Sequence, residues 1–126
     1  MAFTHIKIVG IDQKSSTRES GDLFNVALNL STAPPPEWNQ LFNANWGGVL
    51  YSMKRKAYAS RGLIIITCVP AELETDHISY LNAAVAETNA TYVKYLAERQ
   101  VMKDKVAKKD TEDKALLSGI EAKLFQ

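Results

Sequence analysis

The chain changes character at Pro70. Before this residue, short apolar runs alternate with polar residues at a period near two, which is typical of β-strands. After it, the sequence contains a single glycine, Gly119, and no further proline, and its apolar residues recur at steps of three and four. The chain is therefore expected to form a small sheet followed by a long helical region.

Composition limits the classes of protein that fit this pattern. The chain has 126 residues, is 46% hydrophobic and 23% charged, and carries a formal charge of +1, so it has no strong field for nucleic acid or an anionic membrane. Cys68 is the only cysteine, which excludes an internal disulfide. The N-terminus lacks the pattern of a secretory signal, and the longest apolar run, residues 63–69, is too short to cross a membrane. We therefore expect a cytoplasmic protein.

Two apolar segments before the first prolines predict a pair of antiparallel strands. Residues 5–11 carry apolar side chains on both faces, which predicts a strand covered on both sides. The polar residues 14–21 predict a mobile loop between the two strands. The second strand alternates strictly, which predicts burial of one face (Phe24, Val26, Leu28 and Leu30) and exposure of the other (Asn25 and Asn29).

Three consecutive prolines, Pro34–Pro36, separate these strands from a short helix. The last proline suits the first helical turn, where no amide hydrogen is required. Gly47 and Gly48 end the helix. Large apolar residues lie at helical spacing between these limits and are expected to pack on the sheet: Trp38, Leu41, Phe42 and Trp46.

Two further strands and a helical region complete the prediction. Residues 49–59 predict an edge strand, and residues 63–69 predict a central strand buried on both faces. The acidic residues that follow Pro70 favour a helix N-terminus, and Asp110-Thr111 predicts the start of a second helix.

The order ββαββα predicts an α+β fold, a two-layer sandwich. A four-stranded, mainly antiparallel sheet is expected to carry helices on one face and a C-terminal helical extension. The predicted division places the sandwich with its long helix in residues 1–109 and the C-terminal helix in residues 110–126.

Residue patterns for catalysis and for metal binding are weak. Cys68 and His77 could form a nucleophile and base only if the fold brought them together, and Cys68 fits better as a small buried side chain in an apolar strand. Neither histidine, His5 or His77, has a metal-ligand spacing, and no glycine-rich phosphate loop occurs. We predict no catalytic residue, no metal site and no cofactor, so an enzyme is the less favoured interpretation.

One basic stretch interleaves cations with aromatic rings, which could hold phosphates and stack bases. The same residues would also protect a sheet edge from strand-to-strand association. A site for an anionic small molecule, a nucleotide or nucleic acid is therefore the alternative hypothesis, and it would use Lys54, Arg55, Lys56, Tyr58 and Arg61.

The C-terminal residues support the first hypothesis, a non-enzymatic protein that binds itself or another protein. Charges occupy nearly every other position of residues 94–114, so this segment is expected to face water. The apolar residues that follow must either fold back as a helical hairpin or pack on another chain, most simply as a homodimer with no membrane partner. The interface residues of this hypothesis are Leu116, Leu117, Ile120, Leu124 and Phe125.

Overall fold

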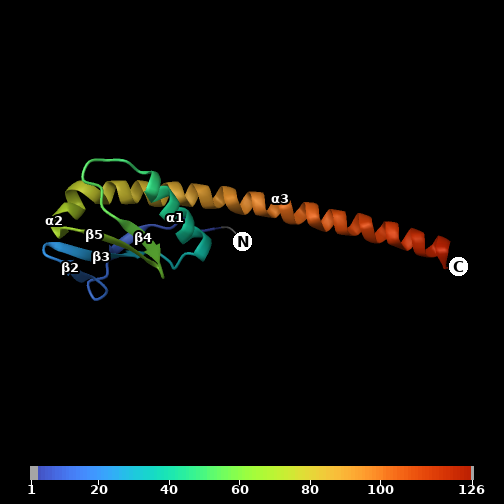
Figure 1. Cartoon of the computed structure of the whole chain (residues 1–126), viewed down its shortest axis with the longest axis horizontal. Coiled ribbons are helices and arrows are strands. Elements are labelled where there is room, and N and C mark those ends of the chain that lie inside the picture. Colours follow the sequence, from blue (N-terminus) through green and yellow to red (C-terminus); the bar gives the residue numbers. More distant parts are fainter. Residues whose placement is uncertain (1–2, 126) are drawn as a thin grey trace. The chain divides into compact units, whose positions relative to one another are not determined.

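A computed structural model describes residues 3–125 and shows an open antiparallel sheet with helices (Figure 1). The chain divides into two units, the first ending at Val93 and the second beginning at Lys94. The elements are β1 (Ile8–Ile11), β2 (Thr17–Ser20), β3 (Leu23–Leu30), α1 (Pro36–Gly48), β4 (Ala57–Ser60), β5 (Leu63–Cys68), α2 (Pro70–Glu72), the π-helix η1 (Leu73–His77) and α3 (Ile78–Leu124).

The sheet has the strand order β1-β3-β5-β4, and β2 also pairs with β3. All pairings are antiparallel, so the predicted α+β architecture is confirmed. The sequence predicted a loop over residues 14–21, but Thr17–Ser20 form the additional strand β2. All four residues of β2 are polar and exposed, so this strand leaves no apolar alternation to detect.

The two faces of the sheet differ in burial. Val26 and Leu28 of β3 lie opposite Ile66 and Ile64 of β5, and all four are buried. The other face carries the fully buried Ala27 and, around it, half-buried residues of the same strands, which are Asn25, Asn29, Leu63, Ile65 and Thr67. The predicted alternation of β3 is thus correct in phase, although Phe24 and the asparagines are half-buried. The prediction that β5 is buried on both faces was wrong, since helices cover only the first face (Figure 1).

Strand β1 also departs from the prediction of two covered faces. Its pairing with β3 is irregular between Ile8 and Gly10. Val9 and Ile11 are 62% and 51% exposed, respectively. An edge strand has a neighbour on one side only, and a bulge turns its side chains away from the regular pleat.

Helix α1 carries the aromatic core that the sequence predicted. Trp38, Phe42 and Trp46 are buried and stack in series, with ring centroids 5.9 Å and 6.3 Å apart and interplanar angles of 10°. Leu41 is half-buried. The helix begins at Pro36, as expected for a proline in the first turn.

The predicted strand over residues 49–59 is shorter in the structure. Residues 49–56 form a loop, and β4 begins at Ala57. Strand β4 is an edge strand, as predicted. Its outer side is partly closed, because the backbone N–H of Ala59 donates a hydrogen bond to Oδ1 of Asn43 in α1 at 2.8 Å. A helix side chain therefore occupies a donor that another strand could use.

Helix α3 is continuous to Leu124, so the predicted second helix starting at Asp110-Thr111 was wrong. The Thr111 hydroxyl donates to the Ala107 carbonyl four residues earlier, at 3.1 Å, a pattern of the helix interior. The Thr111 hydroxyl is thus hydrogen-bonded within the helix. A residue type that is common at helix caps does not by itself begin a new helix. The domain division at residue 110 stays a prediction.

Asn89 of α3 links three parts of the first unit. Its Oδ1 accepts hydrogen bonds from the Ile6 backbone N–H and from the Trp38 indole, both at 3.1 Å. Its Nδ2 donates to the Ile6 carbonyl at 2.8 Å. Asn89 is only 4% exposed, so these bonds replace water for every group involved. One amide therefore fixes α3, α1 and the segment that leads into β1.

We predict that Asn89→Ala destabilises the protein by about 3 kcal/mol or more, because it leaves three buried polar groups without partners, each costing roughly 1–3 kcal/mol. Chemical denaturation followed by tryptophan fluorescence measures this change. Asn82→Ala, at an exposed position of the same helix, is the control and should alter stability by less than about 0.5 kcal/mol. Equal stabilities of the two variants would contradict the role given to Asn89.

Candidate functional site

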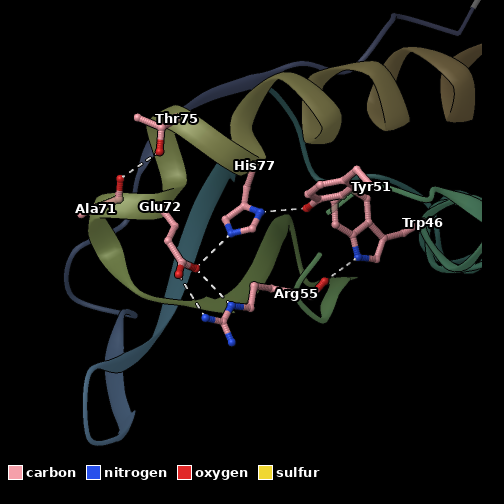
Figure 2. Close-up of polar contacts among 7 residues, drawn as sticks. All are labelled: Trp46, Tyr51, Arg55, Ala71, Glu72, Thr75 and His77. Carbon is pink, nitrogen blue, oxygen red and sulfur yellow. Dashed lines mark hydrogen bonds and ion pairs between the residues drawn. The ribbon is translucent and has the colours of Figure 1, made fainter. Parts of the chain in front are cut away.

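Four polar side chains of the first unit form one connected group, the Glu72 cluster, which we define as Tyr51, Arg55, Glu72 and His77. Figure 2 shows that Glu72 lies between Arg55 and His77, and that Tyr51 lies on the far side of His77. Two members come from loop 49–56, whereas Glu72 ends α2 and His77 ends η1. The cluster therefore joins the loop to the start of the helical region.

Arg55 and Glu72 form a two-pronged ion pair. Nε and Nη2 of Arg55 donate to Oε1 and Oε2 of Glu72, both at 3.0 Å. The Glu72 side chain is 14% exposed. The hydrogen bonds from Arg55 are the main cause that lowers the pKa of Glu72 from 4.5 to about 2, and burial opposes them. The same hydrogen bonds raise the pKa of Arg55 above its usual value. Both groups are therefore charged at neutral pH.

His77 has partners on both ring nitrogens and is completely buried. Nε2 lies 3.2 Å from Oε1 of Glu72, and Nδ1 lies 2.8 Å from the Tyr51 hydroxyl. An ionised carboxylate only accepts, so Nε2 donates to Glu72; in a neutral ring Nδ1 then accepts from Tyr51. Burial is the main cause that raises the pKa of Tyr51 above its usual value. The Tyr51 ring also stacks on the Tyr80 ring, with the two ring centroids 4.0 Å apart.

This geometry indicates a positioning network. A substrate cannot reach the ring nitrogens of His77, because the ring is buried and both nitrogens are already hydrogen-bonded. Loop 49–56 contains the strained residue Met53, with φ 63°, and exposes Leu50. The Glu72 cluster supplies the contacts that hold this loop in one conformation.

Cys68 lies in a setting that keeps it unreactive. The thiol is completely buried, and desolvation is the main cause that raises its pKa above 9.0. The nitrogens of His77 bind Tyr51 and Glu72, which leaves no free base for the thiol. The interpretation of Cys68 as a small buried side chain is therefore confirmed.

The five residues of the predicted anion site differ in their contacts and exposure. Lys54 donates through Nζ to the Trp46 carbonyl at 2.6 Å and lies 5.3 Å from the centre of its ring, so it caps the end of α1. Arg55 is bound to Glu72. Lys56 and Tyr58 are exposed, and Arg61 lies in the turn between β4 and β5 with φ 52°.

A shallow hollow of about 510 Å³ is lined by Lys54, Arg55, Lys56 and Tyr58, together with Trp46 and its neighbours. Arg61 is not part of its lining. The structure thus brings four of the five residues around one hollow, but two of the three cations there already have internal partners.

The residues of the predicted interface are all exposed. Their exposed fractions are 63% for Leu116, 63% for Leu117, 40% for Ile120, 67% for Leu124 and 78% for Phe125. These residues belong to one continuous helix, α3, or directly follow its end at Leu124. Three further exposed apolar residues precede them, and the sequence prediction did not include these: Val101, Met102 and Val106.

Comparisons with known protein families, curated proteins and solved structures gave no match. Within residues 3–125, no group of three or more histidine, cysteine or acidic side chains is arranged to hold a metal ion. Among the described helices, none combines the length and the apolar character that a membrane span requires.

The Glu72 cluster was not predicted from the sequence. Glu72 was interpreted only as a favourable charge at a helix start, and Arg55 as part of a basic edge strand. The two residues are 17 positions apart and no spacing rule connects them. Only the placement of loop 49–56 beside α2 brings them together.

We predict that Glu72→Gln makes stability less dependent on pH in the acid range. The pKa of Glu72 is lower in the folded state than in the unfolded chain, so the carboxylate stabilises the fold above about pH 4.5. This stabilisation is lost as the pH falls toward 2. The variant should melt at a lower temperature than the wild type at pH 7, and the difference should shrink toward pH 2.

Thermal unfolding measured from pH 7 to pH 2 tests this prediction. Glu74→Gln, at an exposed neighbouring position, is the matched control and should keep the wild-type pH profile. A Glu72→Gln profile that runs parallel to the wild type at every pH would contradict the ion pair as the source of the effect.

We also predict that Cys68 reacts with a maleimide only when the protein unfolds, because the folded state buries the thiol and disfavours the thiolate. Mass spectrometry after timed labelling measures the modified fraction. The same protein in denaturant is the control for reactivity. Complete labelling within minutes under native conditions would overturn the assignment.

Proposed function

We propose that this protein is a non-enzymatic interaction protein that associates with a second copy of itself through the second half of α3. The observation that carries the proposal is the exposure of this segment. Every residue from 97 to 125 is exposed, although the segment contains a regular set of large apolar side chains. Such a surface is typical of a contact between chains.

The apolar residues form a stripe along one side of the helix, which we call the α3 stripe. Its members are separated by steps of four and ten residues, so they lie on the same side of the helix. They are 59%, 62%, 63%, 40% and 67% exposed in chain order, and they are Met102, Val106, Leu116, Ile120 and Leu124.

Burial of the α3 stripe would supply the energy for association. Each of these side chains releases roughly 1.5–3 kcal/mol when it is fully buried. A dimer buries the stripe of both chains, which is enough to exceed the roughly 4–15 kcal/mol cost of lost translational and rotational freedom. A single helix that buries none of its side chains gains no such stabilisation.

Binding of nucleotides or nucleic acid at the hollow beside loop 49–56 is the second proposal, and the contacts favour it less. Lys54 and Arg55 already bind the Trp46 carbonyl and Glu72. Lys56 and Tyr58 remain exposed and could contact one phosphate and one base. The hollow offers one exposed cation, Lys56, whereas the sequence suggested four, because Arg61 does not line it.

We predict that the wild-type protein has twice the mass of one chain in light scattering, and that Leu116→Ser/Ile120→Ser/Leu124→Ser has the mass of one chain. The substitutions remove most of the apolar area of the stripe while they leave the first unit unchanged. Ala115→Ser/Ala122→Ser, at positions away from the stripe, is the control and should remain a dimer. A wild-type protein that is monomeric at micromolar concentration would refute the proposed self-association.

A further inference from the structure

We infer that the two copies pair with their α3 helices antiparallel. The basic residues 94–109 of one copy then lie against the acidic residues 110–125 of the other. This inference rests on the proposed self-association and adds the orientation and the contacts of the partner. Three observations support it: the charge asymmetry of the segment, the charged residues within the stripe itself, and the match of apolar positions about residue 111.

The net charge of residues 94–125 changes sign near the middle of this segment. Residues 94–109 contain six basic and two acidic residues, a formal charge of +4, whereas residues 110–125 contain two basic and four acidic residues, a formal charge of −2. In a parallel dimer each half would meet its own copy, and like charges would face one another. In an antiparallel dimer the two halves complement each other, which favours that orientation at low salt.

The charged residues at the helix positions of the stripe also bear on the choice between a parallel and an antiparallel dimer. Arg99, Lys109 and Asp113 continue the three- and four-residue steps of the stripe, so they lie at core positions of a helix pair. A parallel, in-register dimer would place each of them against the identical residue of the second copy. Like charges at such positions oppose association. An antiparallel pair centred on residue 111 removes this contact for Lys109 and Asp113, which then meet each other, whereas Arg99 meets Lys123 near the end of the pair.

An antiparallel dimer centred on residue 111 pairs four of the five apolar residues of the α3 stripe with one another, and Leu124 lies opposite Glu98. Met102 lies nine residues before this centre and Ile120 nine residues after it, so each faces the other across the dimer. Val106 and Leu116 match in the same way at five residues. Lys109 and Asp113 match at two residues and would form an ion pair between the chains.

The Lys109 and Asp113 side chains are already directed toward each other. Within one helix, Nζ of Lys109 lies 3.0 Å from Oδ1 of Asp113, and both side chains are mostly exposed. At the centre of an antiparallel dimer the two pairs lie side by side, so each lysine can contact the acids of both chains. The polar centre of the stripe, which interrupts the apolar side chains, then fixes the register.

Disulfide cross-linking tests the orientation. Met102→Cys and Ile120→Cys are prepared as separate single variants, each of which keeps the buried Cys68, and wild type controls for that thiol. In the antiparallel dimer the two Met102→Cys thiols lie about 27 Å apart, so neither variant should cross-link alone under mild oxidation. An equal mixture of the two variants should give a covalent dimer in which most of the cross-linked material contains one chain of each.

Each outcome has a distinct meaning. Cross-linking of either variant with itself, in a protein that light scattering shows to be a dimer, would overturn the antiparallel orientation and leave self-association intact. A monomeric wild type would instead refute the proposed self-association. Ala122→Cys, half a turn away from the stripe, is the matched control and should not cross-link.

A second measurement avoids substitutions at the stripe. A nitroxide attached to Ala122→Cys on the outer side of the helix reports its distance from the label on the second copy. The antiparallel dimer separates the two positions by about 33 Å along the helix axis, whereas a parallel dimer places them at the same level. A distance distribution centred near 20 Å would overturn the inference even if both stripe variants failed to dimerise.

Discussion

The first unit depends on the hydrogen bonds of Asn89. This buried side chain binds both backbone groups of Ile6 and the indole of Trp38, so it connects the entry to the sheet, the short aromatic helix and α3. Apolar packing alone would let these elements slide against one another, because it has no preferred direction. The amide accepts and donates at fixed positions and thereby selects one arrangement. The stack of Trp38, Phe42 and Trp46 then fills the space that this arrangement defines.

The Glu72 cluster performs a similar task for loop 49–56. Arg55 and Tyr51 of the loop reach Glu72 and His77 at the start of the helical region, and Lys54 contacts the end of α1. Charges that could have attracted a ligand are thus used to hold the loop. The cost of burying Glu72 is offset by two hydrogen bonds from one guanidinium, which is the geometry in which such pairs are most favourable.

The second half of α3 has the opposite character, since every residue from 97 to 125 is exposed. Its apolar side chains follow one side of the helix and its charges change sign near residue 110. These two patterns together favour a second copy in the antiparallel orientation, because that partner covers the apolar stripe and pairs the opposite charges.

Local patterns in the sequence determined the α+β class, the phase of β3, the aromatic face of α1, the edge position of β4 and the buried state of Cys68. These features follow from residue spacing, which decides which side chains share a face. The sequence did not determine strand β2, whose exposed residues carry no apolar pattern, or the continuity of α3 through Thr111, whose hydroxyl is satisfied within the helix. Only the tertiary structure decided that Arg55 meets Glu72 and that Asn89 meets Ile6, because these partners are 17 and 83 residues apart and a contact at such separations depends on how the whole chain packs.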